Sequence, residues 1–156
     1  MSSYEFSNKQ CIKVIETGEK VKIGGFKVST SGQIKHCIVS AYLHKALTGS
    51  EQLRINVYSD DLYSSLLFSS DKLNLSDIVY DITKGWRGEI RFDFPRYNLN
   101  KNFYYYFELE PFAYTRNGDN AFIGISHEFL DPSLSLGSIP SNPQNNVIRM
   151  GIFKYD

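Results

Sequence analysis

Alternation of apolar and polar residues is the feature that most constrains the fold of this chain. In "KHCIVSAYLHK" the apolar residues Cys37, Val39, Ala41 and Leu43 fall on one face. The same period of two recurs in "QLRINVYS", "GEIRFDFP", "NFYYYFELEPF" and "NNVIRMGIFKY". Because successive side chains of a strand point to opposite faces, this period predicts strands with one buried face, and it leaves almost no room for helix.

Turn-forming residues separate the alternating stretches. They occur in "TGE", "TSGQ", "LTGSE", "KGWRGE" and "RNGDN". Asn117-Gly118 is the strongest hairpin signal, because both residues tolerate the positive φ angles of tight turns. Weaker strands are expected around residues 11–15, 21–28, 64–68 and 121–126. About nine short strands at this spacing predict an all-β fold, either an antiparallel β-sandwich or a barrel.

Some segments depart from the alternation. Residues 73–83, "LNLSDIVYDIT", are consistent with a helical turn capped by Ser76 or with another strand. Residues 129–146 hold three of the five prolines and no strand or helix signature. A loop of this length is usually functional or mobile, so it is either a contact region or a surface loop without a role in binding. We therefore expect an N-terminal arm or first strand at residues 1–20 and a single domain at 21–156 that carries the long loop.

Charge and hydropathy exclude several classes of protein. Seventeen basic and seventeen acidic residues give zero formal charge, which argues against non-specific binding of nucleic acid. The longest apolar runs are far below the roughly 20 residues of a membrane-spanning helix, so no membrane insertion is expected. The start, "MSSYEFSNKQ", lacks a basic region followed by an apolar stretch, so we expect synthesis in the cytoplasm without a secretory signal.

The cysteines and histidines do not suggest a metal centre. Cys37 lies in the alternating apolar series and is read as a small core residue, with a bridge to Cys11 as the alternative. The histidines His36, His44 and His127 lack the spacing of a zinc motif, and the first two are expected on a solvent face. Oxygen ligands for calcium are candidates in the loops, although without the DxDxDG pattern; they are Asp60, Asp61, Asp119 and Asp131.

No catalytic motif is present in the sequence. The chain has no GxSxG and no glycine-rich phosphate loop that leads into a helix. Glu108 and Glu110 share a strand face about 7 Å apart, which permits a glycosidase pair, but the simpler reading is a solvated outer face. We therefore predict neither a cofactor nor a metal nor an enzymatic activity. Asp60 and Asp61 in "SDD" are read as a turn between two strands, because short acidic side chains bond to turn backbone.

Aromatic residues on the polar faces offer the remaining functional signal. The candidate ligand-binding residues are Tyr42, Tyr58, Trp86, Tyr104 and Tyr106, with Phe122 as a further aromatic of this kind. Exposed rings stack on sugars and anchor protein partners. The alternative is that these rings cover a second sheet edge or the long loop, and the choice depends on the strand register.

The order of segments resembles a family of jelly-roll domains, related to carbohydrate-binding modules, in bacteriophage virion proteins and bacterial surface proteins. The segments that carry the resemblance are "GGFKV" (24–28), "CIVSAYLHK" (37–45), "EQLRINVYSD" (51–60), "LLFSS" (66–70), "EIRFDFPRYNLNKNFYYYFELE" (89–110) and "MGIFKYD" (150–156). The resemblance implies a jelly-roll-like β-sandwich of about eight to ten strands.

The resemblance also implies a function. It indicates a non-catalytic structural or adhesion module of a phage virion, as a capsid decoration or a tail or fibre component. Such a module is made in the host cytoplasm and contacts other virion proteins, further copies of itself in a homo-oligomer, or a cell-surface glycan. The alternative is a free-standing lectin that resembles a carbohydrate-binding module.

Overall fold

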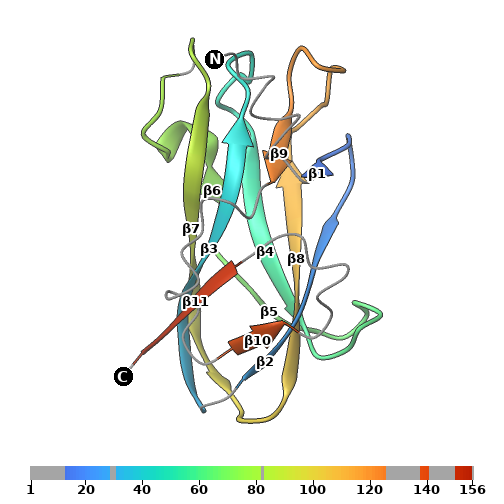
Figure 1. The fold of residues 1–156 in the computed structure, drawn as a ribbon, viewed down its shortest axis with the longest axis vertical. Coiled ribbons are helices and arrows are strands. Elements are labelled where there is room, and N and C mark those ends of the chain that lie inside the picture. Colours follow the sequence, from blue (N-terminus) through green and yellow to red (C-terminus); the bar gives the residue numbers. More distant parts are fainter. Residues whose placement is uncertain (1–12, 29–30, 82, 126–137, 141–149, 156) are drawn as a thin grey trace.

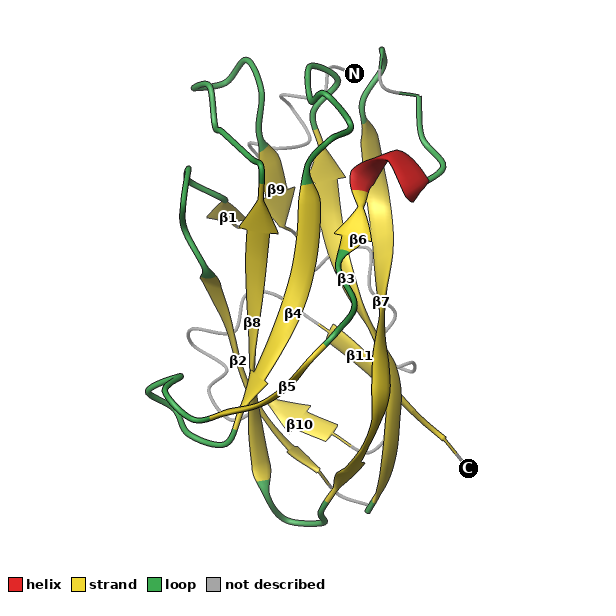
Figure 2. Cartoon of the chain, turned by 180° about the vertical axis from the view of Figure 1, so that it is seen from behind, coloured by secondary structure: helices red, strands yellow, loops and turns green. Residues whose placement is uncertain are grey.

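The computed structural model describes residues 13–28, 31–81, 83–125, 138–140 and 150–155, which form two antiparallel sheets packed face to face (Figure 1, Figure 2). Sheet A contains β1 (Lys13–Val14), β3 (Gly32–Leu43), β7 (Trp86–Leu99), β9 (Ile123–Ile125) and β11 (Met150–Tyr155). Sheet B contains β2 (Val21–Val28), β4 (Gln52–Tyr58), β5 (Leu66–Ser69), β6 (Leu73–Asn74), β8 (Tyr104–Phe112) and β10 (Ser138–Pro140). The predicted antiparallel β-sandwich is confirmed.

The chain changes sheet at almost every connection. The strands β1 to β4 alternate between sheets A and B, and β7 to β11 do so again. In sheet A, β3 pairs with β7 along one edge and with β9 and β11 along the other. In sheet B, β8 lies between β2 and β4. This repeated crossing between layers joins the two sheets into one antiparallel sandwich.

The predicted inward faces fill the space between the sheets. Each of the following side chains is at most 5% exposed: Cys37, Val39, Ala41, Leu43, Leu53, Ile55, Val57, Ile90, Phe92, Phe94, Tyr105, Phe107 and Leu109. Glu89, Arg91 and Asp93, on the opposite face of β7, are exposed as predicted. Cys37 is a free thiol inside this core, so the alternative bridge to Cys11 is wrong.

Several predicted outward faces are wrong. His36 and His44, expected on a solvent face, are 8% and 3% exposed. His36 lies in β3, which is paired along both edges, and Arg91 and Asp93 of β7 lie near it, while Phe122 packs on His44 just after the strand. Phe103, which the alternation in "NFYYYFELEPF" places on the inward face, is instead 59% exposed, because β8 begins only at Tyr104 and Phe103 belongs to the preceding turn.

The connections confirm some expectations and correct others. Asn117 and Ala121 form a bridge around a turn with Gly118 at φ +52°, as predicted. However, this turn joins β8 in sheet B to β9 in sheet A, so it does not connect two paired strands. Residues 73–83 begin with β6 and continue as a 3-10 turn, η1 (Leu75–Asp77), so Ser76 lies inside the turn and does not cap it.

The ends of the chain are partly described. Of residues 1–20, Lys13–Val14 form β1 and pair with β9, within the strand expected around residues 11–15, and residues 1–12 lie outside the described part. The long loop was expected to hold no strand, but Ser138–Pro140 pair with β2 as β10. The remainder of 129–146 lies outside the described residues. No helix in the described part of the chain is long and apolar enough to cross a membrane.

Candidate binding groove

The β4–β5 connection is a compact loop organised by Asp60. Its carboxylate accepts hydrogen bonds from the backbone N–H groups of Ser64 (3.1 Å) and Ser65 (2.8 Å) and from the Ser64 hydroxyl. These bonds, that of the Ser64 hydroxyl first, hold the pKa of Asp60 below its usual range. The predicted turn at "SDD" is confirmed. Asp61, the next residue, takes no part in these bonds and is exposed.

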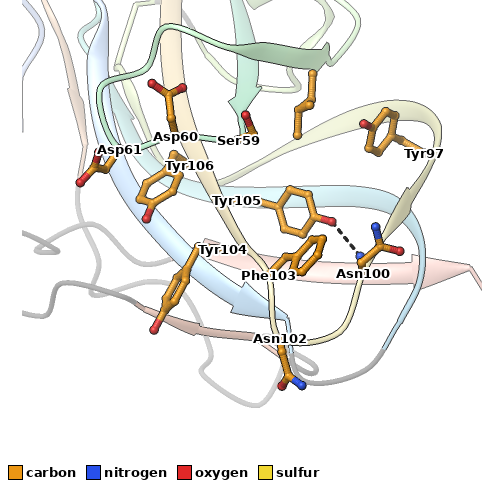
Figure 3. Close-up of a pocket in the computed structure, with 11 residues that line it drawn as sticks. Ser59, Asp60, Asp61, Tyr97, Asn100, Asn102, Phe103, Tyr104, Tyr105 and Tyr106 are labelled. Atoms are coloured by element: carbon orange, nitrogen blue, oxygen red, sulfur yellow. Dashed lines mark hydrogen bonds between the residues drawn. The ribbon is translucent and has the colours of Figure 1, made fainter.

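The β7–β8 turn lies at the same end of the sandwich (Figure 1). Asn102 has a φ of +71° and donates its N–H to the carbonyl oxygen of Val28 (2.7 Å). The N–H of Asn100 donates to the hydroxyl of Tyr105 (2.7 Å), as Figure 3 shows. The turn is therefore fixed at both ends, and this fixes the place from which Phe103 projects.

A groove of about 690 Å³ opens between this loop and this turn (Figure 3). Its lining residues are Ser59, Asp60, Asp61, Leu67, Tyr97, Asn100, Asn102, Phe103, Tyr104, Tyr105 and Tyr106. The rings of Tyr104 and Tyr106 are stacked side by side along β8, with centroids 6.3 Å apart and planes 29° apart. The volume is within the range of small-ligand sites, and the lining combines aromatic faces with a few polar groups.

The groove is acidic. None of its described lining residues is Lys, Arg or His, and two are aspartates. Burial, and then the negative charge of Asp61, raise the pKa of Tyr106 above its ordinary value. The phenol of Tyr106 therefore stays protonated at neutral pH and can donate a hydrogen bond.

A buried hydrogen-bond network adjoins the groove on the outer face of sheet B. The Oε1 of Glu108 accepts hydrogen bonds from the hydroxyl of Tyr58 (2.9 Å) and from Nδ2 of Asn56 (3.1 Å). Burial, followed by the hydrogen bond to Glu108, raises the pKa of Tyr58 to about 12. The ring of Tyr63 lies over this network, 5.4 Å from the ring of Tyr58 and 5.9 Å from that of Tyr106.

Glu110 continues the network along β8. It forms an ion pair with Arg54 (2.7 Å) and a longer one with Lys20 (3.7 Å). Burial by itself would raise the pKa of Glu110, but hydrogen bonds from Asn56 and Arg54 outweigh it and hold that pKa below the usual range. The predicted solvated face for this carboxylate pair is wrong at Glu108, which is 5% exposed.

The structure separates the five predicted ligand-binding residues. Tyr104 and Tyr106 line the groove, while Tyr58 lies beside it but is only 8% exposed. Tyr42 is 3% exposed and packs on Phe122 in sheet A, so the prediction of an accessible ring there is wrong. Trp86, also in sheet A, is half-buried against the core and does not belong to the groove.

Sequence reasoning did not group most of the other lining residues. The alternation in "NFYYYFELEPF" places Tyr105 on the inward face, and no local pattern marks Tyr97, Asn100 or Asn102. The pairing of β4 with β8 brings the end of β4 beside the start of β8, which places the two connections next to each other. Locating the groove requires knowledge of this strand pairing. Local alternation does not show which strands pair.

The calcium candidates within the described ranges, Asp60, Asp61 and Asp119, do not form a metal site. Among the residues that the structure describes, no three His, Cys, Asp or Glu side chains gather in a way that could hold a metal ion. Asp119 lies 4.0 Å from Arg116, and Asp131 is outside the described residues.

The fold and the groove together define the class of this protein, an antiparallel β-sandwich with an aromatic and acidic surface groove. No family model matches the chain, and no curated protein matches it.

Proposed function

We propose that this chain is a non-catalytic adhesion module that binds a saccharide in the groove between the β4–β5 loop and the β7–β8 turn. The observation that carries the proposal is the lining of this groove. It places exposed aromatic faces next to amide and carboxylate groups in one open site.

The chemistry of the lining supports a saccharide. The apolar face of a sugar ring packs on an aromatic face, and its hydroxyl groups need hydrogen-bond partners. Tyr104 is 41% exposed and Phe103 is 59% exposed, so both rings are accessible. Asn100 and Asn102 offer amides that both donate and accept hydrogen bonds.

The state of the carboxylate pair supports a non-catalytic role. A glycosidase needs one carboxyl group that is protonated and free to act as an acid. Glu110 is held ionised by Arg54, and Glu108 lies beneath Tyr63 with two hydrogen-bond donors on one oxygen. Neither group lines the groove.

The location that we propose is a phage virion, on the capsid or on a tail or fibre. The support is the ordered resemblance of segments between residues 24 and 156 to jelly-roll virion domains, together with the sandwich itself. The partners would be other virion proteins or further copies of this chain. A free-standing lectin is the alternative, and it uses the same groove.

A glycan array with the purified chain tests the binding function. We expect saturable binding that is lost in Tyr104→Ala and kept in Val79→Ala, a control that removes an apolar side chain 95% exposed and outside the groove. Absence of binding to any glycan, or binding that survives Tyr104→Ala, contradicts the proposal. Hydrolysis of a bound glycan that Glu108→Gln abolishes contradicts the non-catalytic part.

Purification of particles tests the location. A virion protein is expected to co-sediment with capsid or tail proteins and to remain with them after washing in high salt. Recovery of the chain only from the soluble fraction would favour the free-standing lectin.

A further inference from the structure

The lining of the groove contains carboxylate groups as well as aromatic rings. Asp60 and Asp61 lie at one side, and aromatic rings of β8 lie beside them (Figure 3). With no Lys, Arg or His in its described lining, the groove has no internal cation to neutralise these carboxylates. The two carboxylates therefore attract a positively charged ligand, and low-dielectric aromatic walls strengthen this attraction.

The two aspartates have different roles. The carboxylate of Asp60 is engaged by Ser64 and Ser65 and maintains the loop. Asp61 makes none of those bonds, is exposed, and lies close enough to Tyr106 to raise the pKa of that phenol. Asp61 is therefore the carboxylate whose charge is available to a ligand packed on Tyr104 and Tyr106.

Resting on the proposed function, we infer that the groove selects saccharides that carry a free ammonium group, that is, amino sugars without an N-acetyl group. The sugar ring packs on Tyr104 and Phe103, and the ammonium group lies toward Asp61. The same carboxylates repel uronic acids and other anionic sugars. An N-acetylated sugar keeps the shape of the ring but loses the charge that Asp61 attracts.

Aromatic rings reinforce this preference. A cation within about 6 Å of an aromatic centroid is attracted by the negative face of the ring. The neighbouring rings of Tyr104 and Tyr106 offer such faces along the same side of the groove. An ammonium group beside them therefore gains from the rings as well as from the carboxylate.

A matched pair of ligands tests the inference. The probes are a glucosamine tetrasaccharide and its fully N-acetylated counterpart, titrated into the full chain by calorimetry at about pH 5.5. We expect the glucosamine tetrasaccharide to bind at least about fivefold more tightly, and the ratio to fall as salt is added.

Isosteric variants separate the charge from the fold. Asp61→Asn is expected to reduce the ratio of the two affinities to about one, because it removes the charge that favours the glucosamine tetrasaccharide. Asp119→Asn is the control, because it removes one carboxylate that is 81% exposed in the turn at the opposite end of the sandwich (Figure 1). It should leave the ratio as it is in the parent chain.

The outcomes distinguish this inference from the proposed function. Equal affinities, a preference for the N-acetylated probe, or no binding of the glucosamine tetrasaccharide overturn the selectivity for ammonium. Binding of any other glycan at the groove in those cases still supports the proposed function. Failure of all glycans, charged or neutral, overturns both.

Discussion

At the scale of single residues, Tyr58 shows how the outer face of sheet B is stabilised. Its hydroxyl donates to a carboxylate, that of Glu108, which is itself buried. Tyr58→Phe leaves that oxygen with one donor fewer, and a buried acceptor that loses a partner costs about 1–3 kcal/mol. We expect the free energy of unfolding in urea to fall by about 2 kcal/mol.

Tyr104→Phe is the control for this prediction. It removes a phenolic hydroxyl from a ring that is 41% exposed, so water can replace the lost interactions. We expect a change below about 0.5 kcal/mol, as for most surface substitutions. Equal effects of the two variants would show that the bond between Tyr58 and Glu108 does not stabilise the fold.

Glu110 gives the stability of the chain a dependence on pH. Its pKa in the folded state lies below the ordinary value of about 4.3, because Asn56 and Arg54 bind the ionised form. The stabilisation is therefore present above about pH 4.3 and is lost as the pH falls through the lowered pKa of the folded state. We expect Glu110→Gln to be about 1 kcal/mol less stable than the parent chain at pH 7, with a smaller difference near pH 3. A difference that does not depend on pH would contradict this assignment.

At the scale of elements, Tyr114 ties three segments together. It lies in the connection from β8 to β9, and its hydroxyl donates to the carbonyl oxygen of Ile15 (2.7 Å) and accepts from the N–H of Ile123 (3.0 Å). Tyr114 is 6% exposed, so water cannot readily replace either bond. This one phenol therefore holds β1 and β9 at the edge of sheet A.

We expect Tyr114→Phe to reduce the free energy of unfolding by about 2–3 kcal/mol, because it leaves two buried backbone groups without this partner. Hydrogen exchange locates the effect. The amide of Ile123 should exchange faster in the variant, relative to amides of β4 in the same sample. Unchanged protection of Ile123 would show that other groups hold this edge.

The same elements show what local sequence can predict. Alternation placed Leu53, Ile55 and Val57 correctly in the core, since a single buried face is enough to define the inward set. It failed for His44 and Glu108, because their burial comes from neighbours distant in the sequence, such as Phe122 and Tyr58. Polar residues therefore identify the outer face of a strand, but they do not show whether neighbouring side chains bury that face.

At the scale of the whole molecule, the groove depends on how the strands pair. Its two walls come from connections separated by more than thirty residues, and only the pairing of β4 with β8 brings them together. Local patterns identified Tyr104 and Tyr106 as outward aromatics, yet they placed Tyr42 and Trp86 in the same class. The site could be predicted only in part. Local sequence identifies aromatic residues on outward faces, but their convergence in one groove depends on strand pairing.

The unfolding of the whole sandwich can be followed through Cys37. Its thiol is fully buried between the sheets, and burial, with a smaller contribution from Asp93, raises its pKa well above the usual range. A thiol reagent needs the accessible thiolate, so reaction requires the core to open. In a Cys11→Ser background, we expect labelling to be far slower in the folded chain than in urea.

Labelling also tests whether the two sheets unfold as one unit. If they do, a loss of about 2 kcal/mol in Tyr114→Phe raises the open population about 30-fold, since every 1.4 kcal/mol is a factor of ten. The labelling rate of Cys37 should then rise by the same factor, although Cys37 lies in β3 and Tyr114 lies in the connection from β8 to β9. A rate that Tyr114→Phe leaves unchanged would mean that β3 opens independently of the β1–β9 edge. Because β3 pairs with β7, β9 and β11, we expect the rates to change together.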